Sequence, residues 1–93
     1  MAILQDILYK VNLRSLVGNS AVVIADLQID SRKVNPGSAF IAIVGSDADG
    51  HDFIQKAIDN KAAAIICSRL PDFLSDDITY VEVADSGAAA AAR

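Results

Sequence analysis

Two apolar runs of the chain contain no polar residue. Residues 39–44 read Ala-Phe-Ile-Ala-Ile-Val, and residues 62–67 read Ala-Ala-Ala-Ile-Ile-Cys. A short run of this kind, bounded by turn formers, is typical of a strand that is covered on both faces, as in a parallel sheet. The pattern therefore predicts two buried strands, with residues 39–44 at the centre of the fold.

Further strands are expected on either side of these runs. Residues 21–29 predict one or two strands with a kink at Ala25-Asp26, and Leu27 and Ile29 alternate with polar neighbours. Residues 79–83 also alternate, which predicts a strand with one exposed face. Between the strands, Asn35-Pro36-Gly37 predicts a turn, and residues 68–77 predict a surface loop.

Helical periodicity appears in two places. A first amphipathic helix is predicted from the spacing of Ile3, Leu4, Ile7, Leu8 and Val11, before the chain is broken at 18–20. A second helix is predicted after Asp49, an N-cap residue with Asp52 at the capping-box position and Asn60 as a left-handed C-cap. Its apolar face consists of Phe53, Ile54, Ala57 and Ile58.

The order of these elements predicts an α/β fold: one small domain with a mixed, mostly parallel sheet flanked by helices. A chain of 93 residues has room for one core and not for two domains. Asp85 or Ser86 can cap a helix through 88–93, but its alanines offer no apolar stripe for docking. We therefore expect a domain that continues into a longer protein.

Composition narrows the classes of partner. Eight basic and twelve acidic residues give a net charge of −4 without any basic run, which disfavours nucleic acid. Residues 1–8 lack the long apolar region of a signal peptide, and no stretch approaches the length of a membrane span. The single Cys67 lies within an apolar run, which indicates a buried, inert thiol and fits a reducing, cytoplasmic setting.

Polar loops border the central strand and are the candidate binding segments. Before it, Ser31 offers a hydroxyl and Arg32 a planar cation, which together suit a phosphate oxygen. After it, residues 45–50 lead into the predicted helix N-terminus, which favours anions. The alternative is purely structural: Arg32 pairs with Asp30 or Asp26, and the glycine-containing loop only forms a turn and a cap.

Catalytic machinery is not indicated by the residue types. The only histidine, His51, lies near the start of the predicted helix and is expected to make a contact there rather than act as a base. His51 and Cys67 do not have zinc-ligand spacing. Residues 45–50 contain no lysine and no threonine, so they do not form a phosphate-binding loop for ATP.

Beyond these local patterns, a long series of residues resembles the N-terminal domain of the Mur ligases. The family pattern is DSR-x-V-x-PG-x-x-F-x-A-x-x-G-x-x-x-DGH-x-F/Y-I-x-x-A-I, and the matching residues here are Asp30-Ser31-Arg32-Lys33-Val34, Pro36-Gly37, Phe40-Ile41-Ala42, Gly45, Asp49-Gly50-His51-Asp52-Phe53-Ile54 and Ala57-Ile58. The resemblance extends over about residues 4–86. It departs at Ser38, at 46–48 and at Asn60-Lys61-Ala62, where the family prefers Gly-Ala; the departures at Ser38 and 60–62 are expected not to touch the ligand loops.

The resemblance implies that residues 1–93 are the UDP-substrate-binding domain of an ATP-dependent, amide-forming ligase of peptidoglycan precursor synthesis. It implies that Ile29 and Ser31 line the uridine-diphosphate site, with Ser31 near the diphosphate, and that Ser46, Asp47 and Ala48 contact the uracil. Arg32 and His51 match the motif and are possible binding residues or structural ones. ATP, Mg²⁺ and catalysis are implied for a central and a C-terminal domain outside this chain.

Within the family, residues 80–86 resemble the ligases that add diaminopimelate or lysine to UDP-N-acetylmuramoyl-L-alanyl-D-glutamate. Ligases that add D-alanyl-D-alanine share the Asp30-Ser31-Arg32 and Asp49-Gly50-His51 blocks and are the first alternative. A non-catalytic interaction domain is the second.

Overall fold

A computed structural model of the chain describes residues 2–4, 13–19, 21–43, 50–72 and 74–83. Its strands are β1 (Ala2–Ile3), β2 (Leu13–Val17), β3 (Val23–Ile24), β4 (Asp26–Gln28), β5 (Ser38–Ile41), β6 (Ala64–Cys67) and β7 (Thr79–Val83). One α-helix, α2 (Ile54–Asp59), is described, together with the 3₁₀ turns η2 (Ser31–Lys33) and η3 (Gly50–Phe53).

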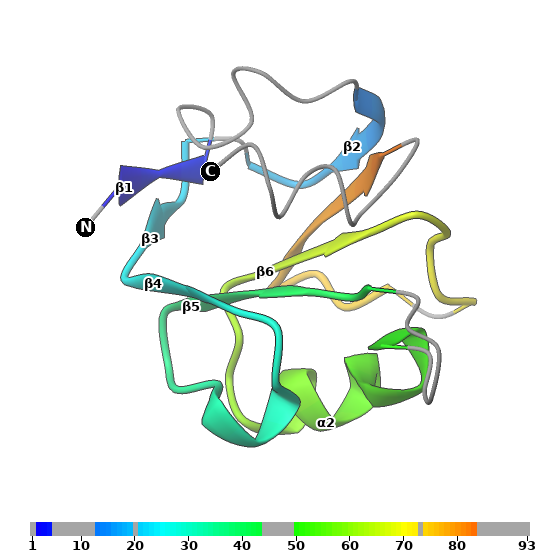
Figure 1. Cartoon of the computed structure of the whole chain (residues 1–93). Coiled ribbons are helices and arrows are strands. Elements are labelled where there is room, and N and C mark those ends of the chain that lie inside the picture. The colour runs from blue at the N-terminus through cyan, green and yellow to red at the C-terminus, as the bar shows by residue number, and fades with distance from the viewer. Residues whose placement is uncertain (1, 5–12, 20, 44–49, 73, 84–93) are drawn as a thin grey trace.

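Five strands form the main sheet, in the order β2-β7-β6-β5-β4 (Figure 1). Strands β4 to β7 pair in parallel, and β2 pairs antiparallel with β7 at one edge. The connection from β5 to β6 runs through α2, as expected for two parallel neighbours that need a crossover. The predicted mixed, mostly parallel α/β sheet is confirmed.

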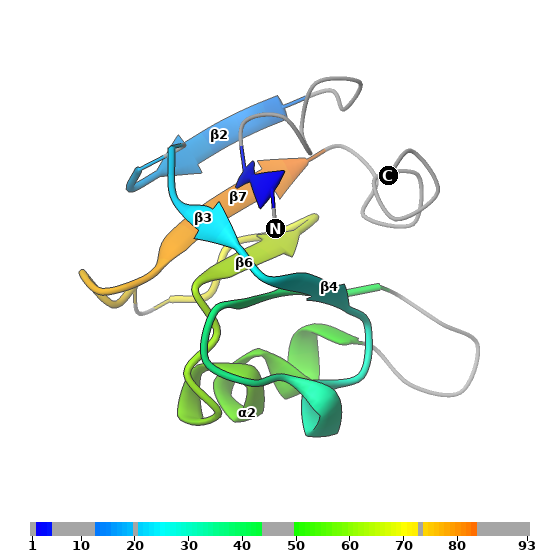
Figure 2. The same ribbon diagram turned by 90° about the vertical axis from the view of Figure 1, so that its left-hand side faces the viewer.

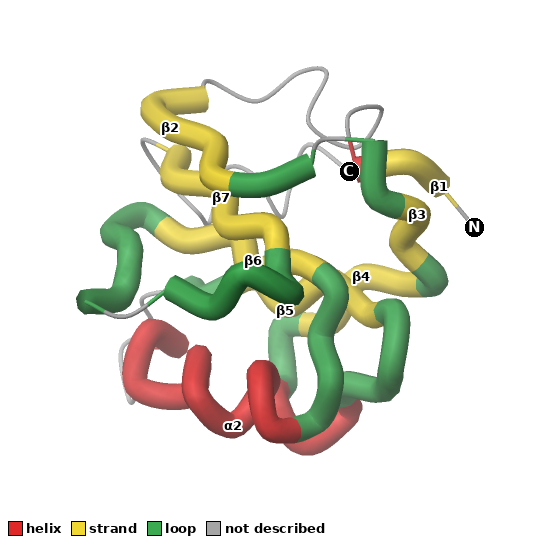
Figure 3. Tube along the Cα trace, turned by 180° about the vertical axis from the view of Figure 1, so that it is seen from behind, coloured by secondary structure: helices red, strands yellow, loops and turns green. Residues whose placement is uncertain are grey.

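The two faces of the sheet are covered by different structures, as the views from the side and from behind show (Figures 2 and 3). On one face lie α2 and η2; on the other lies the small β1–β3 ribbon. Side chains alternate between two cores accordingly. The core on the helix side includes Val34, Phe40, Ala42, Ile54, Ala57, Ile65 and Tyr80, and the core on the ribbon side includes Leu4, Ile24, Ala39, Ile41, Ile66, Val81 and Val83.

Both apolar runs form buried strands, as predicted. All four residues of β5 and all four of β6 are buried. The prediction that residues 79–83 expose one face is wrong, because only Glu82 in β7 is partly exposed. Strand β7 lies inside the sheet between β2 and β6, and both of its faces meet a core.

The predicted kink at Ala25-Asp26 is confirmed, since it separates β3 from β4. Strand β2 was not predicted: its register shifts between Leu13 and Ser15, and this irregularity interrupts the alternation that would reveal a strand.

Of the two predicted helices, the second is found and the first is contradicted at Ile3. Ile3 belongs to β1 and not to a helix; β1 pairs with β3, and residues 5–12 lie outside the described part. The second helix is confirmed as α2, but the left-handed C-cap at Asn60 is wrong. Asn60 has a φ of −86°, and the left-handed residue is Lys61 with a φ of 71°.

Asp49 and residues 85–93 lie outside the described residues, so the caps predicted there stay predictions. None of the helices in the described ranges is long and apolar enough to cross a membrane.

Candidate functional site

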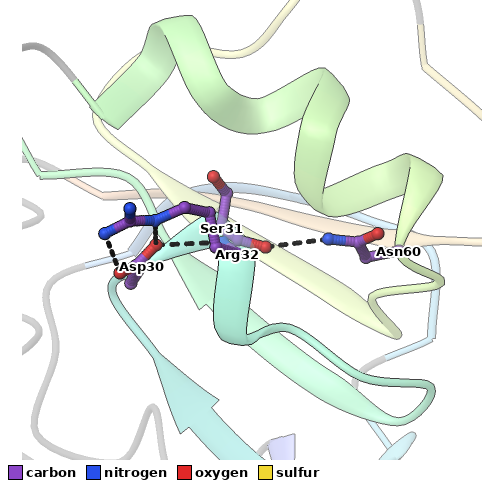
Figure 4. Close-up of polar contacts among 4 residues, drawn as sticks. All are labelled: Asp30, Ser31, Arg32 and Asn60. Atoms are coloured by element: carbon purple, nitrogen blue, oxygen red, sulfur yellow. Dashed lines mark hydrogen bonds and ion pairs between the residues drawn. The ribbon is translucent and has the colours of Figure 1, made fainter.

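The Asp30-Ser31-Arg32 segment forms a tight turn just after β4. Asp30 precedes η2 with an extended backbone, and its carboxylate accepts a hydrogen bond from the Arg32 backbone N–H at 2.9 Å. The Arg32 guanidinium donates to both oxygens of the same carboxylate, from Nε at 3.1 Å and from Nη2 at 2.9 Å (Figure 4). One aspartate thus caps the turn and binds its cation in a bidentate pair.

The structure identifies the carboxylate that pairs with Arg32. Its guanidinium forms an ion pair with Asp30, as the structural alternative expected, and not with Asp26. The Asp26 carboxylate instead accepts from the Ser38 hydroxyl and from the Gln28 side chain. The pair neutralises the Asp30 carboxylate, and Lys33 leaves the turn with a net positive charge. The Arg32 side chain stays 82% exposed and retains donors beside those that bind Asp30.

The ion pair also sets the protonation of the turn. Hydrogen bonds from the Arg32 side chain and backbone lower the pKa of Asp30 to about 2 from its ordinary 3.8, and the carboxylate raises the pKa of Arg32. Because the pKa of Asp30 is lower in the folded chain than in the unfolded chain, its ionised form stabilises the fold. This stabilisation is complete at pH values above the pKa of the unfolded chain and is lost as the pH falls towards 2.

We therefore expect the carboxyl carbon of Asp30 to titrate with a midpoint near 2 in an NMR pH series, and the Arg32→Gln variant to move this midpoint back towards 3.8. A midpoint near 4 for Asp30 in the unchanged chain would show that the pair does not form in solution.

Ser31 lies at the centre of this turn and is only 5% exposed. Its carbonyl accepts from the Val34 backbone N–H at 3.3 Å and from the Asn60 side-chain amide at 3.0 Å. The hydroxyl points away from the Asp30 carboxylate (Figure 4), and none of the hydrogen bonds found among the described residues uses it. Ile29, the residue between β4 and Asp30, is 59% exposed, so its side chain is accessible to a ligand.

His51 lies in η3, just before α2, and makes a structural contact with the end of a strand. Its Nε2 accepts from the Ser68 backbone N–H at 3.1 Å and lies 3.2 Å from the Ser68 hydroxyl. Ser68 follows β6, so the imidazole joins η3 to the end of a core strand. The sequence predicts a contact of His51 at the helix start, and the contact seen here is instead with the segment that follows β6.

Gly50 is placed by the protein's own backbone. Its N–H donates to the Ile43 carbonyl at 2.8 Å, so this donor at the start of η3 is not available to an anion. Ser46, Asp47 and Ala48, the predicted uracil contacts, lie outside the described residues, as do Gly45 and Asp49.

The structure thus joins Asp30, Ser31 and Arg32 in one turn and places His51 at η3, which precedes α2. The 3₁₀ turn η2 packs against α2, and the six residues of this helix span roughly 9 Å. No hydrogen bond links His51 to the Asp30–Arg32 turn among those described.

Asn60 was missed by sequence reasoning. The expectation that the departure at residues 60–62 does not touch the ligand loops is wrong, because the Asn60 amide contacts Ser31. The only signal was an amide side chain at a helix end, and the sequence does not say which segment lies beside it.

Cys67 is fully buried, and its thiol lies 3.5 Å from the Val81 carbonyl. Burial, together with Glu82, raises the pKa of this thiol to about 11, so it is not a thiolate nucleophile at neutral pH. The predicted inert thiol is confirmed. Within the described ranges, no group of three or more His, Cys, Asp or Glu side chains is placed to hold a metal ion.

Comparisons with known proteins agree with the motif. A family profile described as "Mur ligase family, catalytic domain" matches residues 23–91. The UDP-N-acetylmuramoyl-L-alanyl-D-glutamate–2,6-diaminopimelate ligase of Phocaeicola vulgatus is 35% identical over 83 residues, which is 89% of this chain and 17% of that protein. The ligase of the same name from Cytophaga hutchinsonii is 42% identical over 87 residues, covering 92% of this chain and 18% of the relative.

Solved structures give the same fold. The UDP-N-acetylmuramoylalanyl-D-glutamyl-2,6-diaminopimelate–D-alanyl-D-alanyl ligase of Acinetobacter baumannii matches 74% of this chain and 15% of its own, with a TM-score of 0.66 at 30% identity. The MurF ligase of Thermotoga maritima, solved in complex with ADP, matches 70% of this chain and 14% of its own, with a TM-score of 0.59 at 35% identity.

The chain spans about a sixth of the length of the curated relatives it matches. The matching profile nevertheless covers most of the chain and includes both the Asp30–Arg32 turn and the segment that contains His51. This chain therefore belongs to the Mur ligase family.

Proposed function

We propose that this chain anchors the UDP end of UDP-N-acetylmuramoyl-L-alanyl-D-glutamate in a ligase that adds an amino acid, such as diaminopimelate, to that precursor. The observation that carries the proposal is the identity of 35–42% to the Phocaeicola and Cytophaga proteins named above, each over about nine-tenths of this chain. The domain assignment over residues 1–93, a substrate-binding N-terminal domain followed by others, is part of the same proposal.

A second candidate is the corresponding part of a ligase that adds D-alanyl-D-alanine. The solved structures described above, at 30–35% identity to this chain, are a D-alanyl-D-alanyl ligase and a MurF ligase. The two candidates share a UDP-bearing substrate, so both assign the same task to this part of the protein. They differ in the peptide that the substrate carries, so a ligation assay of the longer protein with each substrate separates them, and binding to this chain does not.

In this proposal the buried Ser31 donates its hydroxyl hydrogen to a diphosphate oxygen. A hydrogen bond to a charged group is among the stronger ones in proteins, and the neutralised Asp30–Arg32 pair does not repel an anion as a free carboxylate would. Ile29 offers an exposed apolar contact, and Ser46, Asp47 and Ala48 are proposed to contact the uracil. Arg32 and His51 support the site chiefly by holding its turns.

The residues present do not fit ATP or Mg²⁺. Residues 45–50 lack the lysine of a phosphate-binding loop, and no metal-ligand group is found in the described ranges. We therefore assign ATP, Mg²⁺ and the amide-forming step to central and C-terminal domains of a longer, cytoplasmic ligase. In that protein this chain contributes substrate binding alone.

The Ser31→Ala variant tests the proposed role directly. We expect its affinity for UDP-N-acetylmuramoyl-L-alanyl-D-glutamate to fall about tenfold, since a hydrogen bond to a charged group contributes about 1.5 kcal/mol or more. Isothermal titration calorimetry measures the affinity, and the thermal midpoint checks folding. Because no described hydrogen bond uses the hydroxyl, the midpoint should stay close to that of the unchanged chain.

Ser75→Ala is the matched control, because Ser75 lies on the loop between β6 and β7. Among the contacts described for the chain, its hydroxyl accepts from the Asp77 backbone N–H at 3.4 Å. The control should bind like the unchanged chain. Equal affinity in Ser31→Ala and Ser75→Ala would exclude Ser31 from the diphosphate site.

A further inference from the structure

A side chain from another element donates a hydrogen bond to the backbone of the candidate binding turn. The Asn60 amide, at the C-terminal end of α2, donates from Nδ2 to the Ser31 carbonyl at 3.0 Å across 29 positions of sequence (Figure 4). Both residues are at least partly buried. This contact ties the turn that carries the Ser31 hydroxyl to a helix packed on the core.

The end of α2 does not need this side chain. The Asn60 backbone N–H donates to Lys56, Lys61 donates to the Ile58 carbonyl, and Ala62 donates to the Ala57 carbonyl. The helix is therefore closed by backbone hydrogen bonds and by the positive φ of Lys61. The amide of Asn60 is available for a task outside its own helix.

Ser31 has few other restraints on its backbone. The turn is closed from within by the Lys33 N–H to Asp30 carbonyl bond at 3.0 Å and by the long Val34 N–H to Ser31 carbonyl bond at 3.3 Å. Among the described hydrogen bonds, that from Asn60 is the one that reaches residues 31–34 from beyond the local segment 30–35. Its loss would leave η2 held by its own short-range hydrogen bonds and by its packing against α2, without a hydrogen bond from that helix among those described.

We propose that Asn60 is a positioning residue for substrate binding: by fixing the Ser31 carbonyl, it holds the turn in the conformation in which the Ser31 hydroxyl meets its ligand. This inference rests on the proposed function of the turn. When only a fraction of the molecules has the binding-competent conformation, the apparent affinity falls in proportion to that fraction. Releasing the turn therefore lowers the affinity without removing any contact with the ligand.

The test compares Asn60→Ala and Asn60→Asp with Gln55→Ala. Aspartate keeps the size of asparagine but has no N–H to donate, and it sets an oxygen against the Ser31 carbonyl. Gln55 is the matched control, because it is an exposed amide on the same helix whose Nε2 donates to Asp59 at 3.0 Å and not to the turn. Affinity for UDP-N-acetylmuramoyl-L-alanyl-D-glutamate is measured by calorimetry, and exchange of the Val34 amide by NMR.

We expect both Asn60 variants to bind about three- to tenfold more weakly, the range that one neutral hydrogen bond represents, and to exchange the Val34 amide faster. Gln55→Ala should bind and exchange like the unchanged chain. A role in filling space alone would be preserved in Asn60→Asp, and Asn60→Ala adds no charge that could repel the diphosphate. A loss in both variants with a retained thermal midpoint therefore indicates positioning.

The outcomes separate this inference from the proposed function. Binding by the unchanged chain with unaltered affinity in both Asn60 variants would overturn the positioning role and leave the proposed function standing. Absence of binding by the unchanged chain, when the folded state is verified by its NMR spectrum, would overturn both.

Discussion

Replacing Gly50 with alanine is expected to destabilise the domain severely, by about 3 kcal/mol or more, because the site has no room for a side chain. A Cβ at this position would lie 2.6 Å from the Ile43 nitrogen, 2.9 Å from the Ile43 oxygen and 3.1 Å from the Ala42 carbonyl carbon. All three are backbone atoms at the end of β5, and they cannot rotate away as a side chain can.

The close approach has a structural cause. The Gly50 N–H donates to the Ile43 carbonyl at 2.8 Å, which draws the start of η3 against the chain leaving the central strand. A methyl group would break this bond or displace β5. A domain of this size has a free energy of unfolding of only about 5–10 kcal/mol. The substitution would therefore remove a large fraction of its stability.

Urea denaturation followed by circular dichroism measures this effect, with Gly37→Ala as the comparison. Gly37 has a φ of +95°, which disfavours alanine, but a Cβ there meets only the Ala25 Cβ at an ordinary 3.4 Å. Gly50→Ala should therefore lower the midpoint more than Gly37→Ala, although Gly50 lacks a positive φ. The reverse order would show that backbone conformation, and not the contact with Ile43, requires the glycine.

Truncating Phe40 to alanine is expected to cost about 3–5 kcal/mol, the range for a large aromatic side chain removed from a core. Phe40 is fully buried in β5, with Gln28 on β4 and Ile65 on β6 as its strand partners. Its ring belongs to the core between the sheet and α2, which also contains Ile54 and Ala57 of that helix. A cavity there weakens the support of both candidate binding segments.

The measurement is again the urea midpoint, with Phe53→Ala as the control because Phe53 is 45% exposed. Phe40→Ala should lower the urea midpoint by a large fraction of its original value, and Phe53→Ala should lose well under half as much stability. Similar losses of stability in the two variants would contradict the burial of Phe40 in the core.

The buried strands could be predicted because their residues carry the information locally. An uninterrupted apolar run such as Ala64–Cys67 is stable only when both faces are covered, and a parallel sheet provides that cover. Strand β7 misled prediction because Thr79 and Glu82 look like surface residues, whereas burial is decided by its neighbours β2 and β6. Strand β2 was hidden by the irregular pairing between Leu13 and Ser15.

At the candidate site, contacts between neighbouring residues could be predicted and contacts between distant segments could not. The pairing of Arg32 with Asp30 is a contact between residues two apart, and it was among the alternatives that the sequence offered. The contacts of Asn60 with Ser31 and of His51 with Ser68 join segments 29 and 17 positions apart. Such pairings depend on how the helix packs on the sheet, which residue types and spacing alone do not specify.

The central claim is that this chain binds the uridine-diphosphate end of a peptidoglycan precursor, and an NMR titration of the isotopically labelled chain tests it most directly. The ligand is UDP-N-acetylmuramoyl-L-alanyl-D-glutamate, with UDP and ATP as comparisons. We predict that both uridine ligands shift the amide signals of residues 29–32 and 45–51, and that ATP leaves them unchanged. Shifts elsewhere, equal shifts with ATP, or no shifts at millimolar ligand would contradict the claim.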